Sequence, residues 1–470
     1  MRQIKINEKD NVAVMLEGEL AGHKIALENI KKGQDIIKYG YPIGHAAEAI
    51  QTGEHIHSHN LKTNLEGVET YEYHPKRNSL PARDDRKFLG YVREDGSVGI
   101  RNEIWIINTV GCVNKTAELL AREANARYQG QCDGIFSFSH PFGCSQLGDD
   151  QATTQAVLKG MVNHPNAAGV LVLGLGCENN NIPVFREVLG EVNENRVKFM
   201  STQDFEDEIE EGLARIGELV SYAKKFKREE CSLSKLVVGL KCGGSDGFSG
   251  LTANPLIGQV SDQLIAGGAS TVLTEVPEMF GAETILMQRC EDEKTFEKTV
   301  ALINDFKHYF IRHNQVVYEN PSPGNKKGGI TTLEEKSLGC VQKSGSADVV
   351  DVLQIGEHVK NKGLNLLTGP GNDIVAVTNL TAAGCHMVLF STGRGTPLGA
   401  PVPTVKVATN HAIAQKKPHW IDFDASPILD GKDLSETFLD YLIQVASGEL
   451  TNNEKRGYRE ISIFKDGVTL

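Results

Sequence analysis

The sequence predicts an α/β protein in which a small N-terminal β-rich module precedes two α/β lobes with mainly parallel sheets. Two observations lead to this prediction. Residues 1–74 contain short alternating apolar runs that many glycines interrupt, and such a pattern is typical of short strands and turns. From Phe88 onward, apolar runs alternate with helix-like segments. Strand, loop and helix in repeated succession indicate a parallel sheet.

The chain divides into four predicted parts. Its 470 residues exceed what one ordinary hydrophobic core organises. After the module at 1–74, residues 75–87 are polar and proline-containing, as in a linker. We expect a first α/β lobe at 88–230 and a second at 231–470.

Composition narrows the classes of function. The net charge is −12, from 61 acidic and 49 basic residues, and the basic residues form no long patch, so we expect no nucleic-acid partner. No apolar run approaches the roughly 20 residues that span a bilayer, and the N-terminus has no signal-peptide core. The nine cysteines contain no CxxC pair. We therefore expect a cytoplasmic protein with reduced thiols and no membrane partner.

A dense histidine motif, GEHIHSHN, lies inside the module. His55, His57 and His59 alternate with other residues, so a strand here would place all three imidazoles on one face. Imidazole is the commonest metal ligand and the usual acid or base near neutral pH. The alternative is a solvated histidine edge, which is a less frequent reason for three histidines in five residues. His23 and His45 are further candidates for the same site.

Three cysteines follow three predicted strands of the first lobe. The strands are expected at 104–110, 135–139 and 169–175, and the cysteines after them are Cys112, Cys144 and Cys177. Open α/β sheets bind ligands at the carboxyl ends of their strands, so we consider these thiols, with Glu178 beside the third, as candidate ligands or pocket lining. The alternative is a set of packed thiols without chemistry.

The second lobe begins with a glycine-rich loop, GLKCGGSDGFSGLTANPLIG. It carries Lys241, Cys242, Ser245 and Asp246 between an apolar run and a helix-like segment that contains Asn254. Glycines let the backbone approach a ligand closely, and a helix N-terminus favours negative charge. The loop therefore suits a carboxylate or a phosphate, although a tight turn without a ligand would use the same residues.

Two later segments also predict ligand contacts. The loop NPSPGNKKGGITT is long and rich in glycine and lysine, which favours a lid or a ligand wall over a spacer. The segment CHMVLFSTGRGTPLG brings Thr392 and Arg394 to the end of a predicted strand. The planar fork of Arg394 can bind both oxygens of a carboxylate, and a surface ion pair is the alternative.

Long motifs along the whole chain resemble one known family, the altronate/galactarate dehydratases. They include GYVREDGSVGIRNEIWI, TVGCVN, FGCSQLGDD, GLGCENN, GGSDGFSGLTANPLIG, TVLTEVPEMFGAE, ENPSPGNKKGGITTLEEKSLGC and GCHMVLFSTGRGTPLG. The resemblance implies that residues 1–74 form a SAF-type module, a β-clip. It also implies dehydration of a sugar acid, D-altronate to 2-dehydro-3-deoxy-D-gluconate, with iron(II) as the metal and manganese(II) as a substitute.

The chemistry of dehydration suggests roles for these residues. Abstraction of a weakly acidic proton and expulsion of hydroxide both benefit from a divalent cation, a base and an acid. We expect His55, His57, His59 and His23 as metal ligands, with His57 also able to transfer protons. The remaining expected roles are Lys241, Asp246 and Glu178 in catalysis, Ser245, Arg394, Thr392 and Asn254 in substrate binding, and Cys112, Cys144, Cys177 and Cys242 as ligand or pocket thiols.

Other functions stay open. Within enzymes, the motifs also resemble galactarate dehydratase and sulfolactate sulfo-lyase, which eliminate from related 2-hydroxy acids. Outside enzymes, the histidine module could bind a metal or a ligand without turnover. The partner that we expect is a small sugar acid, and a homodimer is one option for the assembly.

Overall fold

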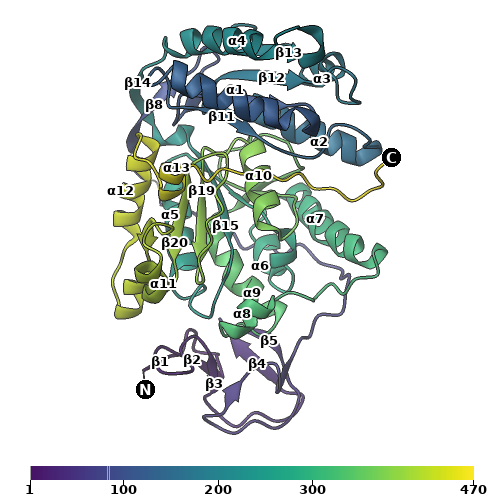
Figure 1. Cartoon of the computed structure of the whole chain (residues 1–470). Coiled ribbons are helices and arrows are strands. Elements are labelled where there is room, and N and C mark those ends of the chain that lie inside the picture. The colour runs from purple at the N-terminus through teal and green to yellow at the C-terminus, as the bar shows by residue number, and fades with distance from the viewer. Residues whose placement is uncertain (1, 82, 84) are drawn as a thin grey trace.

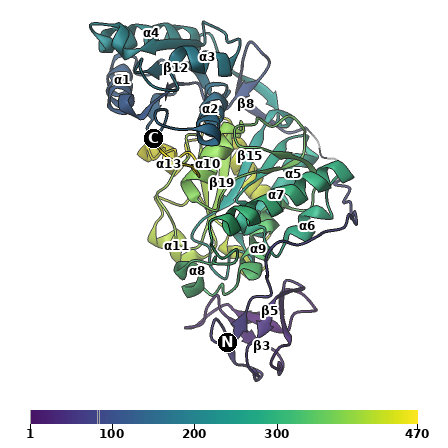
Figure 2. The ribbon, with the colours of Figure 1, turned by 90° about the vertical axis from the view of Figure 1, so that its right-hand side faces the viewer.

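The computed structural model describes residues 2–81, 83 and 85–470. Residues 82 and 84, which belong to the predicted linker 75–87, lie outside the described residues. Figures 1 and 2 show the β-rich module at one end, the first lobe at the other, and the second lobe between them. None of the helices formed by the described residues combines the length and apolarity that a membrane crossing needs.

The N-terminal module consists of short antiparallel strands, as its alternating pattern predicts. One sheet has the order β1-β2-β3-β6 and the other β4-β5-β7. Their buried faces share a core that includes Val12, Ile36, Ile43 and Ile56. The strands are β1 (Gln3–Ile4), β2 (Val12–Met15), β3 (Lys24–Ala26), β4 (Asp35–Lys38), β5 (Tyr41–Ala46), β6 (His55–Ile56) and β7 (Leu61–Lys62).

The first lobe is built on a four-stranded parallel sheet, order β11-β10-β12-β13. Every residue of β10 and β12 is buried, as expected for strands covered on both faces. The sheet contains β10 (Glu103–Asn108), β11 (Ile135–Phe138), β12 (Ala167–Gly174) and β13 (Val197–Ser201), with helices α1 (Asn114–Arg127), α2 (Gly148–Val162), α3 (Ile182–Leu189) and α4 (Glu208–Ala223). A small antiparallel sheet joins β8 (Lys87–Val92), β9 (Val98–Gly99) and β14 (Arg228–Ser232).

The second lobe is built on a seven-stranded parallel sheet with the order β17-β18-β16-β15-β19-β20-β21. Its strands are β15 (Val237–Cys242), β16 (Ser270–Leu273), β17 (Val349–Leu353), β18 (Leu364–Leu367), β19 (Met387–Thr392), β20 (Thr404–Ala408) and β21 (Phe423–Asp424). Its helices are α5 (Ala253–Ala266), α6 (Glu283–Met287), α7 (Glu293–Arg312), α8 (Pro323–Lys327), α9 (Leu333–Cys340), α10 (Asp373–Ala382), α11 (His411–Lys416), α12 (Ser435–Ala446) and α13 (Asn452–Arg456). The predicted fold class, a β-rich module followed by two α/β units, is confirmed.

The first lobe and the module pack against opposite ends of the central sheet. At the start of β19, Asn166 of the first lobe donates to the carbonyl of His386. At the carboxyl end of β15, the loop that carries Gly247 packs against Gly22 of the module. A six-residue strand is roughly 20 Å long, so the sheet keeps the two contacts well apart. The module therefore covers the end of the sheet where parallel α/β folds bind ligands.

Candidate active site between the module and the second lobe

Four histidines of the module face one another next to the second lobe. The Nδ1 atom of His23 lies 3.1 Å from Nε2 of His55. The ring centroid of His57 lies 5.5 Å from those of His23 and His55, and that of His59 lies 5.9 Å from that of His55. His23 reaches this cluster because it directly precedes β3, and β3 pairs with β6, which contains His55. The fifth candidate, His45, contacts Asn64 instead, at 2.7 Å.

The strand that was expected to align the histidines ends early. Strand β6 covers only His55 and Ile56, so the prediction of one strand that contains all three histidines is wrong. The chain then turns, because the amides of Asn60 and Leu61 both donate to the carbonyl of His57. The side chain of Asn60 completes the turn by accepting from the amide of His57. The turn, rather than a pleated strand, brings His59 back toward His55.

The histidine cluster offers neutral nitrogen donors. Burial is the main cause that lowers the pKa of His55, to about 4, and the imidazoles of His23 and His57 lower it further. Burial, followed by His57, also lowers the pKa of His23. At neutral pH these two rings are uncharged, and their facing nitrogens lie 3.1 Å apart, close enough for both to bind one cation. Among the described residues, no three histidines bring ring nitrogens within 4.8 Å of one another, so a third histidine ligand requires a side-chain rotation. Neutral imidazoles are ligands that suit iron, zinc or copper, so this donor set fits an iron-type divalent ion.

A loop of the second lobe forms one wall of the site. His57 donates from Nε2 to the carbonyl of Lys326, over 2.8 Å. Asn325 donates to the carbonyl of Ser245, also over 2.8 Å, and the amide of Gly247 donates to the carbonyl of Gly328 over 2.7 Å. The loop NPSPGNKKGGITT thus lies between the histidines and the glycine-rich loop, and its central residues form α8.

Glycines allow this contact to be so close. A Cβ atom on Gly247 would lie 1.8 Å from the carbonyl oxygen of Gly22, and one on Gly329 would lie 2.3 Å from the same oxygen. Gly329 also has a φ of +97°, which side chains rarely tolerate. The glycine-rich loop was expected to let its backbone approach a ligand closely. Its Gly247 also lets the backbone of the module approach.

A buried ion triad fixes the module to helix α9. Lys24 and Lys38 each lie 2.8 Å from a different carboxylate oxygen of Glu335. Lys24 also donates to the carbonyl of Gly329 and the hydroxyl of Thr331. Burial raises the pKa of Glu335, but the two ammonium groups outweigh it and lower that pKa to about 2. The module is therefore held by charge as well as by packing.

The predicted catalytic residues of the glycine-rich loop are largely engaged with protein groups. Lys241 is buried between Glu275, at 3.1 Å, and Asp373, at 2.5 Å. Asp246 accepts hydrogen bonds from Thr409, Asn410, Ser249 and the amide of Phe248. Burial raises the pKa of Asp246.

Ser245, in contrast, keeps a free group. Its side chain is only 2% exposed, and within the described part of the chain its hydroxyl has no hydrogen-bond partner. A buried polar group without a partner costs free energy, so the hydroxyl of Ser245 is available to a bound molecule.

The predicted substrate-binding residues separate into two kinds. Arg394 lies beside the glycine-rich loop, since its amide donates to the carbonyl of Gly244, and it is exposed. No ion pair of its guanidinium is found among the described residues. Asn254 is fully buried and engaged with Gly339 and Ser391, and Thr392 accepts from the amide of Gly395. Arg394 is thus an exposed cation without an ion-pair partner among the described residues, whereas Asn254 links protein segments.

A cavity of about 380 Å³ opens beside this wall, within the range that small-molecule sites occupy. Lys326, whose carbonyl binds His57, lines it together with Pro277, Asn320, Ser322 and Gly371. A smaller cavity of about 170 Å³, lined by Ser58 and also by Lys326, lies on the module side. Both cavities border Lys326, and neither is lined by the four histidines, by Ser245 or by Arg394.

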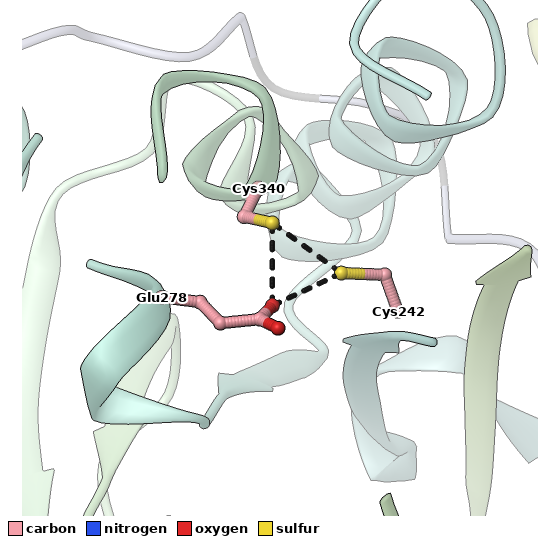
Figure 3. Close-up of side chains that lie close together, drawn as sticks. All are labelled: Cys242, Glu278 and Cys340. Atoms are coloured by element: carbon pink, nitrogen blue, oxygen red, sulfur yellow. Dashed lines mark hydrogen bonds between the residues drawn. The ribbon is translucent and has the colours of Figure 1, made fainter. Parts of the chain in front are cut away.

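A second group of candidate metal ligands lies deeper in the lobe. The sulfur atoms of Cys242 and Cys340 are 3.4 Å apart, and each lies 3.2 Å from Oε2 of Glu278 (Figure 3). Lys343 donates to the sulfur of Cys242 over 3.0 Å, and Lys336 lies 2.8 Å from Oε1 of Glu278. The hydrogen bond with Cys340, and then Lys343, lower the pKa of Cys242 to about 7. Because two ammonium groups already balance the negative charge, this group fits a cation less well than the histidines do.

Glu178 and three of the predicted thiols are not brought to this site. Glu178 belongs to the first lobe, where its carboxylate accepts from the hydroxyl of Thr109 at 2.6 Å and from the amides of Leu175 and Gly176. Burial raises the pKa of Glu178, but these hydrogen bonds outweigh it and lower the pKa. Cys112, Cys144 and Cys177 follow β10, β11 and β12 of the same lobe, and this lobe lies at the opposite end of the molecule from the module (Figure 1).

Sequence reasoning missed the buried charged groups that organise the site. Lys24, Lys38 and Glu335 were not singled out, nor were Lys336 and Lys343. Part of the signal was present, because Glu335 and Lys336 belong to the quoted motif TTLEEKSLGC. A lysine and a glutamate 311 positions apart cannot be paired from one sequence.

Comparisons with known proteins match this architecture. The family model described as altronate/galactarate dehydratase SAF domain matches residues 19–64. The second domain of D-galactarate dehydratase/altronate hydrolase matches 90–224, and the C-terminal domain of D-galactarate/altronate dehydratase matches 233–469.

Curated relatives match over nearly the whole chain. Altronate dehydratase of Escherichia coli (strain K12) is 56% identical, over 98% of this chain and 94% of its own. Altronate dehydratase of Bacillus subtilis (strain 168) is 54% identical, over 99% of both chains. Galactarate dehydratase (L-threo-forming) of Escherichia coli (strain K12) is 32% identical, over 95% of this chain and 93% of its own.

Proposed function

The chain belongs to the D-galactarate/altronate dehydratase family of hydro-lyases, and we propose that it dehydrates D-altronate to 2-dehydro-3-deoxy-D-gluconate. The identity above 50% to two proteins named altronate dehydratase supports this substrate over galactarate. The structural observation that carries the proposal is the cluster of four histidines, which contacts the loop that also binds the segment of Ser245, next to Arg394.

The reaction sets clear demands on these residues. The proton on C2 of an aldonate is weakly acidic, and the hydroxyl on C3 is a poor leaving group. We propose that His23, His55, His57 and His59 hold iron(II), with manganese(II) as a substitute. A bound divalent ion would stabilise the negative charge of the substrate carboxylate and of the departing oxygen. His57 is held by the carbonyl of Lys326, so its orientation is fixed.

The remaining residues position the substrate in this proposal. Arg394 binds the carboxylate, because its fork has no ion-pair partner among the described residues and it lies beside the glycine-rich loop. Ser245 gives its free hydroxyl to a substrate oxygen. Lys241, held between Glu275 and Asp373, keeps positive charge near the end of β15. Asp246 and Glu178 hold their loops in shape, since their oxygens are already occupied.

An anaerobic activity screen tests this function. The chain would be incubated with D-altronate, galactarate or sulfolactate, each with iron(II), with manganese(II) or without metal, and the 2-keto acid product measured. We expect turnover of D-altronate with iron(II), lower turnover with manganese(II), and none without metal. Faster turnover of galactarate, or release of sulfite from sulfolactate, would replace the proposed substrate. Tight binding of aldonates without any product would instead make the chain a binding protein.

The cellular location and the oligomeric state are two further proposals. We propose a cytoplasmic location, which fractionation of cells would test. A homodimer remains a prediction, and sedimentation of the purified chain would measure it.

A further inference from the structure

Three thiols of the first lobe have no part in the proposed dehydration. Among the cysteines, all of which the structure describes, Cys112, Cys144 and Cys177 are exposed, Cys132 is half-buried and five are buried. Cysteine is among the residue types most often buried, and exposed thiolates are open to oxidation. Three exposed thiols on one sheet edge therefore indicate a ligand.

The sheet places the three cysteines side by side. Strand β10 lies between β11 and β12, and all three run parallel. Ile107 of β10 is level with Phe138 of β11, and Asn108 is level with Leu173 of β12. Each cysteine follows its strand within a few residues, and neighbouring strands are about 4.8 Å apart. The thiols therefore lie on three adjacent loops at one edge.

Hydrogen bonds lock these loops together around the cysteines. The amide of Gly111, next to Cys112, donates to the carbonyl of Phe142 over 2.9 Å. Gly143 and Ser145, on either side of Cys144, contact the loop after Cys177: Asn180 donates to the carbonyl of Gly143 over 2.9 Å, and Ser145 donates to Asn179 over 2.8 Å. A Cβ atom on Gly143 would lie only 1.9 Å from the carbonyl of Thr109. The three loops thus form one rigid platform.

The surroundings of the sulfur atoms suit an anionic cluster. Within the described residues, their side-chain hydrogen-bond partners are neutral: Gln203 lies 3.7 Å from the sulfur of Cys177, and the hydroxyl of Ser145 lies 4.0 Å from that of Cys144. Helix α1 starts two residues after Cys112, so its positive end lies at this edge. The buried pair Cys242 and Cys340 differs, because a lysine already neutralises it.

The spacing of the sulfur atoms excludes one small ion held by all three. Tetrahedral zinc with Zn–S bonds of 2.3 Å requires sulfur atoms about 3.8 Å apart. Among the described residues, the group whose ligand atoms all lie within 4.8 Å of one another is Cys242, Glu278 and Cys340, and not these three thiols. Cysteines that hold an iron–sulfur cluster stand farther apart, because the cluster itself separates them.

We propose that Cys112, Cys144 and Cys177 bind a [4Fe–4S] cluster through three thiolates, which leaves one iron open to a small oxygen ligand. This site goes beyond the proposed dehydration at the histidines. When a preformed cluster with four small thiolate ligands is transferred to the chain, the ligands are exchanged and no iron or sulfur atom changes its oxidation state. Each protein thiol gives its proton to the small thiolate that it displaces, so three small thiols leave and the fourth ligand stays on the open iron.

Anaerobic transfer of such a cluster to the full chain tests the proposal. We expect about four irons per chain, with the broad visible absorption of iron–sulfur bonds. The triple variant Cys112→Ser, Cys144→Ser, Cys177→Ser should lose at least nine-tenths of this iron. Cys132→Ser is the matched control, because Cys132 lies before β11, at the opposite edge of the same sheet, and it should load fully. The double variant His57→Ala, His59→Ala should load fully as well, which separates this site from the proposed function.

Alkylation of the cysteines in the native chain is a second test, and it does not depend on whether the triple serine variant folds. Brief alkylation of the native chain should modify the three exposed cysteines, as mass spectrometry would show, and the alkylated chain should take up no cluster. Full loading after alkylation or in the folded triple variant would overturn the proposal. So would uptake of a single zinc ion in place of the cluster, or a disulfide between two of these thiols in the anaerobically prepared chain.

Discussion

Histidines occupy both ends of the central sheet, and the two groups differ in what their nitrogens meet. At the first-lobe end, Nε2 of His386 donates to the carbonyl of Val98 at 2.7 Å, and its Nδ1 accepts from the amide of Val237. His164 is bound in the same way, by the carbonyl of Cys385 and the amide of Asn166. At the module end, the nitrogens of His23 and His55 face each other.

The comparison shows that a lowered pKa does not by itself mark a functional histidine. Burial lowers the pKa of His386 to about 4, and it also lowers that of His55 to about 4. Burial is the common cause, so the shift reports only the environment. The partners distinguish the groups, because backbone groups bind both nitrogens of His386 and of His164, whereas Nδ1 of His23 and Nε2 of His55 face each other.

The largest effect is expected from the module end. The double variant His57→Ala, His59→Ala should lower kcat/KM by at least about 10²-fold to 10⁴-fold, and the bound iron should fall in parallel. The unfolding midpoint should change little, because neither side chain belongs to the core of the module. Iron analysis, kinetics and thermal melting on one preparation measure all three quantities.

The control for this variant is His45→Ala, in the same module. His45 is half-buried and contacts Asn64 rather than the other histidines. It should keep both activity and iron. If the double variant stayed active and kept its iron, the module would be removed from the active site.

The next largest effect concerns what holds the module in place. Glu335→Gln would leave Lys24 and Lys38 buried without their shared carboxylate. Breaking a buried ion pair in this way costs about 3–5 kcal/mol. We expect easier proteolysis of the module and loss of activity, while the sheet of the second lobe persists. The exposed pair Lys87 and Glu230 supplies the control, since Glu230→Gln should cost less than about 1 kcal/mol. Equal effects of the two changes would contradict a role for the triad.

The sequence predicts those features of the two ends of the sheet that depend on residues close together in the chain, and it misses those that depend on distant residues. The glycine-rich loop follows β15 as expected, and the strands expected at 104–110, 135–139 and 169–175 form as β10, β11 and β12, because local patterns determine them. The histidine motif was found by its density, but its turn was missed, since alternation also fits a strand. The partners of Asp246 come from Thr409 and Asn410, more than 150 residues away. No local pattern can show that its carboxylate is already occupied.

A smaller effect is expected at Asp246. Asp246→Asn removes one acceptor oxygen from a carboxylate that binds Thr409 and Asn410. If the residue only holds the loop, the variant should lose about 1–3 kcal/mol of unfolding free energy with kcat within a few-fold of the native value. If it acts on the transition state, kcat should fall far more than KM rises. We expect the first result, and steady-state kinetics with thermal melting distinguishes the two.

The smallest effect is expected at the first-lobe end, and it depends on pH. His386→Gln should lower stability by about 1 kcal/mol at neutral pH and leave iron binding unchanged. In the folded chain His386 takes up a proton only near pH 4, whereas in the unfolded chain it does so near 6.5. Between these values the unfolded state binds more protons, so native stability falls as the pH is lowered. The variant lacks this contribution. One pKa unit corresponds to about 1.4 kcal/mol, so the stability of the variant should first approach and then exceed that of the native chain as the pH falls from 6.5 to 4. Denaturant titrations along this range measure the difference, with exposed His308→Gln as the control. A constant difference would mean that burial does not hold His386 neutral in the folded chain.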